Sequence, residues 1–264
     1  MRFVNDKDPA HPHVHWDYSK NGTDWGIQGE EQSPIDIKVK EAQPMATHYL
    51  KMWWNFDPIV TEVYDNGHTL LLEGAVSRLV GTDCDANNSL YEAVQFHFHS
   101  PAEHTIDGHS YPLELHIVHV ITAEHFSIKE VEEEDFAPQR HIAVLGIFFE
   151  VDDTAAPNTF IDALQLDKVG SGTKIKLNMF EHFGSIESPE YFSYPGSLTT
   201  PPCSEIVNWF VVRKPLKMTS SQLRLFTERK LFAEHGNNRA VQPLGKRHVC
   251  MGNCDYIVDY EYQR

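Results

Sequence analysis

The sequence predicts a mainly β (α+β) fold in a single domain with a few short helices. Short apolar runs, rich in β-branched and aromatic residues, recur along the whole chain and are typical of strands. Turn-forming residues such as Asp65-Asn66-Gly67 separate these runs. Neither an internal repeat nor a long low-complexity linker divides the 264 residues, and β-rich single domains reach this length.

The predicted elements follow from this pattern. Two stretches predict helices: 159–166, with Asn158 as a cap, and 220–232, capped by Thr219 or Ser220. The acidic run 130–135 predicts a solvated loop or a short exposed helix. We assign one domain to residues 1–264, with a flexible N-terminal segment at 1–15. The predicted strands lie at 60–64, 70–72, 94–98, 113–121, 142–149, 175–177 and 206–212.

The charge balance limits the classes of partner. The chain has 38 acidic and 22 basic residues and a net charge of −16, which disfavours nucleic acid and anionic membrane surfaces. A small anionic or neutral substrate remains compatible with it. The longest apolar run, 142–149, is too short to span a bilayer. The first residues lack the apolar core of a signal peptide, so we expect a soluble protein, either intracellular or the mature form of a secreted or lumenal one. Oligomerisation or assembly into a complex stays open.

Two of the predicted strands carry histidines on one face. Side chains alternate along a strand, so Gln95, His97 and His99 share a face, while Phe96 and Phe98 take the other. In the later strand His116 shares a face with Glu114 and Val118. His119 points the opposite way, which predicts a core histidine and not a ligand. We expect the same for His104.

Neighbouring strands would bring His97, His99 and His116 to one ion. Three imidazoles with an open fourth position are typical of catalytic Zn²⁺ rather than structural Zn²⁺. Ligating histidines normally donate their second N–H to a partner that orients the ring. Gln95 and Glu114 each lie two residues before a candidate ligand and on its face, so we predict these two roles for them.

Longer motifs then give the chain a resemblance to a known family. It is similar to the α-carbonic anhydrases from about Trp16 to Leu244. The segment after His99 is short, as in bacterial, plant and protist members. The resemblance implies a large, twisted, mixed but mostly antiparallel central β-sheet with short peripheral helices. The motifs are QSPIDI (32–37), NGH (66–68), QFHFH (95–99), AEHTIDG (102–108), ELHIVH (114–119), AVLGIF (143–148), YPGSLTTPP (194–202) and NxRxxQPL (237–244).

The resemblance also implies an activity: reversible hydration of CO₂ to bicarbonate and a proton, by attack of zinc-bound hydroxide. Thr199 would accept the proton of that hydroxide and donate its own to Glu103, because a hydroxyl can donate and accept at once whereas an ionised carboxylate can only accept. His68 would carry the released proton to buffer, a task suited to a group that titrates near neutral pH. Tyr18 and Asn66 would line the proton path. The residues expected to contact the substrate are Val118, Val144, Leu198, Thr200, Val207 and Trp209.

Some positions depart from the family pattern or leave alternatives. Leu71 occupies a place where some members have a polar residue on the proton path. Cys203 is either free or paired with Cys84 or one of the pair Cys250 and Cys254. The resemblance further implies cis bonds at Ser33-Pro34 and Pro201-Pro202. The alternative function is a carbonic-anhydrase-like structural or binding subunit of a larger assembly, and the intact three histidines, Glu103 and Thr199 argue against it. A zinc hydrolase of another type is a third candidate.

Overall fold

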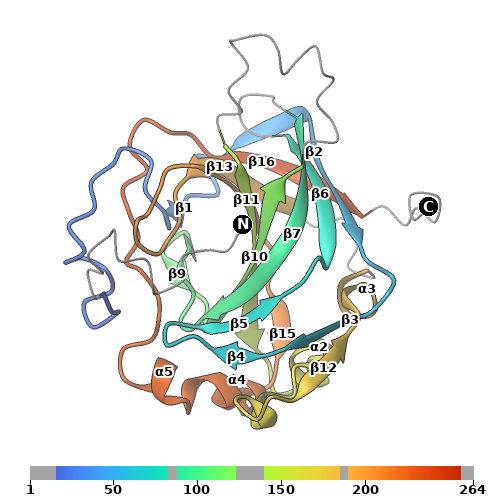
Figure 1. Ribbon diagram of the computed structural model, residues 1–264. Helices are drawn as coiled ribbons and strands as arrows, with labels where there is room; N and C mark the ends of the chain where they lie inside the picture. The colour runs from blue at the N-terminus through green and yellow to red at the C-terminus, as the bar shows by residue number, and fades with distance from the viewer. Residues whose placement is uncertain (1–15, 83–87, 123–139, 185–189, 257–264) are drawn as a thin grey trace.

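The computed structural model describes residues 16–82, 88–122, 140–184 and 190–256 (Figure 1). The segment 1–15, expected to be flexible, and the acidic run 130–135 lie outside the described residues. A central sheet of 11 strands dominates the rest. Its strands are β2 (Gln43–Trp54), β4 (Tyr64–Asp65), β5 (Leu70–Glu73), β6 (Ser77–Thr82), β7 (Asn88–His99), β10 (Leu113–Ile121), β11 (Ile142–Val151), β13 (Glu190–Gly196), β14 (Val207–Val212), β15 (Leu216–Met218) and β16 (Cys250–Tyr256).

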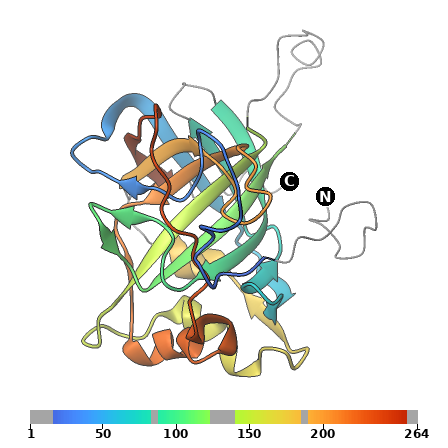
Figure 2. The same cartoon turned by 90° about the vertical axis from the view of Figure 1, so that its left-hand side faces the viewer.

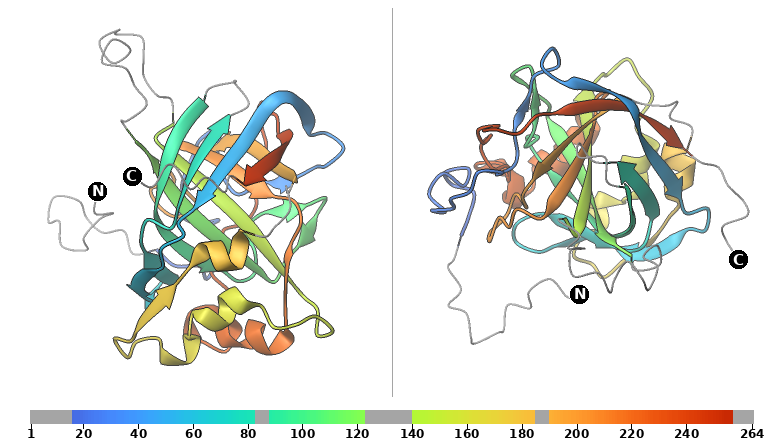
Figure 3. Two further views of the ribbon diagram at one scale, coloured as in Figure 1. Left: turned by 90° about the vertical axis from the view of Figure 1, so that its right-hand side faces the viewer. Right: turned by 90° about the horizontal axis from the view of Figure 1, so that it is seen from above.

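This sheet confirms the predicted fold class. Most of its neighbouring strands are antiparallel, and only β11–β14, β11–β15 and β16–β2 run parallel. One edge of β7 pairs with β6 and then with β5, and its other edge pairs with β10. The path β7–β6–β2–β16–β13–β14–β11–β10 therefore returns to β7, and the strands curve round in a ring when seen from above (Figure 3).

The remaining elements are small and peripheral. Two minor sheets join β1 (Asp36–Ile37), β8 (Thr105–Ile106) and β9 (His109–Ser110), and β3 (Ile59–Glu62) with β12 (Lys174–Leu177). No helix in the described ranges is long and apolar enough to cross a membrane. The helices gather at one end of the sheet (Figures 1 and 2). They are α2 (Thr159–Ala163), η2 (Leu166–Lys168), α3 (Met179–Phe183), α4 (Ser220–Thr227) and α5 (Lys230–Ala233).

Several predicted elements are confirmed with altered ends. Asn158 caps α2 by accepting from the backbone of Phe160 and Ile161, but the helix ends three residues earlier than predicted. Thr219, not Ser220, caps α4 in a reciprocal capping box with Gln222. The predicted helix 220–232 is two helices, α4 and α5, because the chain turns to an extended conformation between them. The strand predicted at 60–64 is likewise divided into β3 and β4. In the central sheet, β2, β6, β13, β15 and β16 lie outside the predicted strands, as do β1, β8 and β9 in the smaller sheet.

The two faces of the sheet pack into two separate apolar clusters. Phe96 and Phe98 belong to the larger cluster, together with Leu115 and Ile117 of the neighbouring strand. Val118 belongs to a smaller cluster on the histidine face, which contains Val144, Val207 and Trp209. The predicted alternation of faces in β7 and β10 is therefore confirmed, and it leaves the histidines on the side of the smaller cluster.

Three X-Pro bonds are cis in the described part of the chain. The bonds at Ser33-Pro34 and Pro201-Pro202 are cis, as the resemblance implies, and Ser100-Pro101 is a third. All three lie outside the helices and strands.

Candidate metal centre

Strand register brings three of the sixteen histidines together. His97 of β7 lies directly opposite His116 of β10, and His99 follows two residues along the same face of β7. The ring centroids are 5.0 Å apart for His97 and His99, 5.3 Å for His97 and His116, and 4.6 Å for His99 and His116. One nitrogen from each ring lies within 4.8 Å of the other two. The three imidazoles could therefore hold one metal ion.

One nitrogen of each ring is held by an oxygen. His97 Nδ1 lies 2.9 Å from Gln95 Oε1, and His116 Nε2 lies 2.9 Å from Glu114 Oε1. His99 Nδ1 lies 2.7 Å from the backbone oxygen of Asn237. Because an oxygen acceptor requires an N–H, these contacts fix the tautomer of each neutral ring and leave the lone pair on its other nitrogen.

The remaining nitrogen of His99 marks the centre most clearly. His99 Nε2 is buried and has no hydrogen-bond partner among the described residues. An unsatisfied buried nitrogen costs about 1–3 kcal/mol. Burial lowers the pKa of all three histidines, that of His99 to about 4, and so keeps the rings neutral. Three neutral imidazoles with converging lone pairs fit a divalent cation of the zinc type, which takes nitrogen ligands and leaves a fourth position open.

Glu114 is a fully buried carboxylate with four donors. Its Oε1 accepts from His104 Nδ1 at 2.8 Å and His116 Nε2 at 2.9 Å. Its Oε2 accepts from the backbone N–H of Glu103 at 2.8 Å and of His104 at 3.0 Å. Burial raises the pKa of Glu114, but His104, His116 and these hydrogen bonds lower it well below its usual value. His104, Glu114 and His116 also cluster closely enough for a metal, but the atoms that face one another are already hydrogen-bonded to each other.

The two remaining histidines of these motifs are core residues, as predicted. His104 is fully buried, and its Nε2 lies 2.6 Å from the Tyr194 hydroxyl. His119 is also fully buried on the opposite face of β10. Its Nδ1 donates to the Ile117 carbonyl at 2.9 Å, and its Nε2 lies 2.9 Å from Ser77 Oγ.

Glu103 and Thr199 meet beside the three histidines. Glu103 is 1% exposed, and its Oε1 accepts from the backbone N–H of Arg239 at 2.8 Å. Burial raises the pKa of Glu103 to about 7, while His116 and the adjacent Thr199 hydroxyl lower it in part. Its Oε2 has no hydrogen-bond partner in the described structure. A dipositive ion on the nearby histidines would favour the ionised form of Glu103, because opposite charges stabilise each other.

An apolar wall adjoins the histidines on the same face. Val118 pairs with Val144, which pairs with Trp209, so the three side chains form a row across β10, β11 and β14. The Trp209 ring centroid lies 4.9 Å from that of His116, and its Nε1 donates to the Ser197 carbonyl at 3.0 Å. Val207 and Leu198 pack into the same cluster. Thr200 is half-buried in the loop beside Leu198.

The residues of the expected proton path are only partly exposed to solvent. The His68 ring stacks on Trp16, with centroids 3.9 Å apart and planes 14° apart. Asn66 is exposed, but its side-chain oxygen accepts from the backbone of His68 at 3.0 Å and Thr69 at 2.8 Å, so it forms the turn. Tyr18 is only 6% exposed and packs between Trp16 and Trp25. Burial, Glu103 and Cys203 raise its pKa well above the usual value. Tyr18 therefore belongs to the inner wall and not to the rim.

Leu71 lies between this turn and the metal centre. It is directly opposite His97 in the β5–β7 pairing, on the same face, and half-buried. Cys203 is buried and forms no disulfide, so the first of its alternatives, a free cysteine, holds in this structure. Cys84 lies outside the described residues.

Sequence reasoning gave no role to Asn237, which ties the metal centre to the His68 turn. Its backbone oxygen orients His99, and its side-chain amide donates to the His68 carbonyl at 3.0 Å and the Phe98 carbonyl at 2.8 Å. Only its place in the NxRxxQPL motif marked it in the sequence, because it lies 138 residues from His99.

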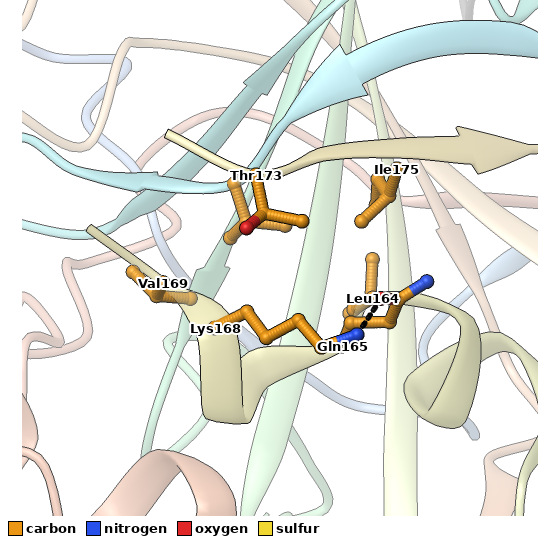
Figure 4. Close-up of a pocket in the computed structure, with 7 residues that line it drawn as sticks. Leu164, Gln165, Lys168, Val169, Thr173 and Ile175 are labelled. Carbon is orange, nitrogen blue, oxygen red and sulfur yellow. Dashed lines mark hydrogen bonds between the residues drawn. The ribbon is translucent and has the colours of Figure 1, made fainter. Parts of the chain in front are cut away.

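A pocket elsewhere in the molecule has no such chemistry. It lies between η2 and β12, near the helices (Figure 4). On its η2 side, Lys168 Nζ donates to Gln165 Oε1 at 2.6 Å. Its lining is otherwise aliphatic apart from Thr173. The three-histidine centre therefore remains the candidate functional site.

The sequence and the fold were compared with those of known proteins. The family model of the eukaryotic-type carbonic anhydrases matches residues 11–253. Carbonic anhydrase from Klebsiella pneumoniae is 31% identical, over 89% of this chain and 90% of the relative. Carbonic anhydrase 7 from Homo sapiens is 33% identical, over 84% of this chain and 88% of the relative. Alpha-carbonic anhydrase from Thermovibrio ammonificans, solved in complex with the inhibitor sulfanilamide, superimposes with a TM-score of 0.66 at 30% identity, covering 89% of this chain and 98% of that one.

Proposed function

The chain belongs to the eukaryotic-type, or α, carbonic anhydrase family, and from this we propose how its residues carry out the reaction. It is a lyase that hydrates CO₂ reversibly to bicarbonate and a proton. We propose that the cofactor is Zn²⁺, held by His97, His99 and His116. The single observation that carries this assignment is the buried Nε2 of His99, which has no other partner among the described residues. Bound zinc would act as a Lewis acid and make water a nucleophile at neutral pH, for which carbonic anhydrases are the standard example.

The residues behind the histidines orient them. Gln95, Glu114 and the Asn237 carbonyl each hold the nitrogen that faces away from the centre. Partners of this kind fix ring orientation and raise ligand basicity, and their loss typically lowers metal affinity by about 10–100-fold. The charge of Glu114 is stabilised by its four donors and would also offset part of the ion's charge.

Thr199 and Glu103 would fix the direction of the hydrogen bond between the reacting oxygen and the Thr199 hydroxyl. A carboxylate only accepts hydrogen bonds, whereas a hydroxyl donates one and accepts others. If the Thr199 hydroxyl donates to Glu103, it can only accept a hydrogen bond from the reacting oxygen. A lone pair of that oxygen is then directed at the carbon of CO₂. The backbone contact from Arg239 holds Glu103 in place for this task.

The apolar wall would hold CO₂ next to this pair. Val118, Val144, Leu198, Val207 and Trp209 offer no hydrogen bonds from their aliphatic and ring surfaces, so they suit a substrate without a dipole and keep bulk water from the reacting carbon. Thr200 supplies a hydroxyl on the other side, suited to bicarbonate. Tyr18, Asn66 and His68 would form the route by which the proton leaves.

One experiment tests the assignment as a whole. We expect rapid CO₂ hydration in stopped-flow assays, loss of it after chelation and dialysis, and recovery on adding one equivalent of Zn²⁺. Sulfanilamide, which the Thermovibrio relative binds, should inhibit the zinc form. A chain that holds zinc yet hydrates CO₂ no faster than buffer alone would contradict the enzyme proposal and leave the structural-subunit alternative, for which no observation here speaks.

His68→Ala should slow the release of the proton without slowing hydration itself. We expect turnover in weak buffer to fall by about 10–100-fold, less than the largest acid–base effects because water and buffer offer other acceptors. kcat/KM for CO₂ should stay within about twofold, since it does not include the transfer to buffer. Added imidazole should restore turnover.

The stacking of His68 on Trp16 gives a readout that does not depend on activity. A protonated imidazole quenches an indole in contact with it, so protonation of His68 on acidification should lower Trp16 fluorescence in the parent. The change should vanish in both His68→Ala and Trp16→Phe. Equal turnover of parent and His68→Ala in weak buffer would exclude His68 from the proton path.

The remaining parts of the proposal concern partners. The excess of acidic residues supports a small-molecule substrate and no nucleic-acid partner. The intact set of three histidines, Glu103 and Thr199 supports an enzyme whether or not the chain also joins a larger assembly.

A further inference from the structure

We propose that Gln32 is a positioning residue that fixes Thr199 relative to Glu103, because its amide joins the two loops on which that pair depends. The proposal rests on the proposed roles of Thr199 and Glu103. Gln32 itself is 5% exposed and lies behind the pair, so it acts through other residues and not on the substrate.

All the contacts of the Gln32 amide are directional. Its Oε1 accepts from Arg239 Nη1 at 2.9 Å. Its Nε2 donates to the Cys203 carbonyl at 3.1 Å and to Glu205 Oε1 at 2.8 Å. A guanidinium can only donate, and a carbonyl and a carboxylate can only accept. The amide therefore has one orientation, and no other residue type of this size supplies an acceptor on one side and a double donor on the other.

The first side of the amide controls Glu103. The Arg239 backbone N–H donates to Glu103 Oε1, so the position of that backbone sets the position of the carboxylate. The Arg239 side chain is 2% exposed, lies over the Trp25 ring at 5.7 Å, and also donates to the Ser33 carbonyl at 2.7 Å. Gln32 and Ser33, which are adjacent in one loop, thus hold the guanidinium. By holding the guanidinium they also fix the backbone of Arg239.

The second side of the amide controls the loop of Thr199. Cys203 closes a turn by donating its backbone N–H to the Thr200 carbonyl at 2.9 Å, and its φ of 54° is left-handed. The Leu198 N–H donates to the Ser204 carbonyl at 3.0 Å. Thr199 and Thr200 therefore lie in a short closed loop, and Gln32 holds the carbonyl at its end.

Glu205 anchors the same amide from outside. Its Oε1 also accepts from the Glu31 backbone N–H at 2.9 Å. The space for this carboxylate depends on Gly29, where an added Cβ would lie 2.0 Å from Glu205 Oε1. A displacement of about 1 Å in a catalytic pair can cost about 10²-fold in rate. We therefore expect a loss of roughly tenfold in kcat/KM when one side of the amide is broken and the other kept.

Gln32→Glu makes that break with little change of shape. The new carboxylate still accepts from Arg239, but it presents an oxygen to the Cys203 carbonyl and to Glu205, where repulsion replaces two hydrogen bonds. Gln32→Met removes both sides of the amide without adding a charge. The matched control is Gln222→Glu, because Gln222 is a buried glutamine, 4% exposed, whose amide bridges the caps of α4 and α2 through Thr219, Asn158 and Asp162.

The kinetic measurement separates positioning from stability. Thermal unfolding shows which variants are folded, and zinc content shows which carry the ion in the parent's proportion. For these variants we measure kcat/KM for CO₂ and the dependence of turnover on buffer concentration, well below the unfolding temperature. Gln32→Glu and Gln32→Met should lose about tenfold or more in kcat/KM, with the half-saturating buffer concentration unchanged. Gln222→Glu should lose stability and keep kcat/KM within about twofold.

Two outcomes would overturn the proposal. One is a parent-like kcat/KM in either Gln32 variant. The other is an equal loss in Gln222→Glu, which would show that lost stability alone slows the enzyme. If Gln32→Glu does not fold, Gln32→Met decides the question. Failure of the proposed function looks different, because the zinc-loaded parent itself would then not hydrate CO₂.

Discussion

His99→Ala should abolish stoichiometric zinc binding and with it nearly all CO₂ hydration. Structural zinc sites bind with roughly 10–16 kcal/mol in all, so one ligand of a small set contributes about 3–4 kcal/mol, or about 10²–10³-fold in Kd. His99 is the sharpest choice of the three, because its Nε2 has no other use in the described structure and its Nδ1 is held by a backbone carbonyl. Zinc content of the purified protein and competition with a chelator measure the effect.

The control for this prediction is the other buried histidine of the same strand pair. His119 is also fully buried but faces the larger core, and Ser77 and the Ile117 carbonyl use both of its nitrogens. His119→Gln should therefore destabilise the fold and still bind one zinc. Thermal unfolding gives a second readout, since a ligand that binds only the folded state raises the unfolding temperature. Zinc should stabilise the parent and His119→Gln but not His99→Ala. The reverse pattern would show that the ion lies on the other face.

Acid should act on the same centre with a definite sign. Burial lowers the pKa of His99 from its usual 6.5 to about 4 in the metal-free fold. A histidine whose folded-state pKa is depressed contributes stability that is present above pH 6.5 and is lost as pH falls towards 4. Protons also compete with zinc for the neutral rings, so zinc affinity should fall over the same range. Removing His99 should weaken the acid sensitivity of the metal-free protein.

The face assignments could be predicted because β7 and β10 alternate over their central residues. Phe96 and Phe98 mark the core face, and the histidines between and beside them must take the other. The two-residue period of a strand makes this inference insensitive to where the strand begins. The same physical regularity separated His116 from His119.

Two of the unpredicted strands, β13 and β16, lack that regularity. In β13 the residues from Tyr191 to Tyr194 are all buried, so no alternation is visible, and Pro195 and Gly196 resemble a turn. Strand β16 contains Gly252 and Asn253, which weaken any strand signal. Tertiary pairing on both edges decides these segments. The contacts of Asn237 with His99 and of Arg239 with Glu103 could not be predicted from the sequence either. A backbone carbonyl makes the first and a backbone N–H the second, and any residue type can supply those groups.

Glu103→Gln should reduce kcat/KM by about 10²–10³-fold, the span expected for a hydrogen-bonding group that acts in the transition state. The Arg239 backbone N–H already donates to Oε1 of residue 103, so a glutamine must turn its oxygen there and its NH₂ towards Thr199. Thr199 would then receive a hydrogen bond where the proposed scheme has it give one, and its hydroxyl would be free to donate to the reacting oxygen. The lone pair directed at CO₂ would be lost while the shape of the site stays the same.

The measurement is stopped-flow hydration with zinc content held at the parent value. Thr199→Ala should cost a similar factor, since it removes the hydroxyl that Glu103 orients. Glu92→Gln is the matched control, because that carboxylate lies at the surface of β7, pairs with Arg78 at 3.1 Å, and should change kcat/KM by less than about twofold.

The double variant tests whether the two residues act as one device. Glu103 has no contact with the substrate in this scheme and affects the reaction only through the hydroxyl of Thr199. Once Thr199→Ala has removed that hydroxyl, the further change Glu103→Gln should cost almost nothing, and the double variant should match the worse of the two single ones. Losses that multiply would mean that Glu103 acts on the centre by a separate route, through its charge beside His99 and His116. The cycle thus distinguishes a directed hydrogen bond from a general field, which the loss in either single variant alone does not.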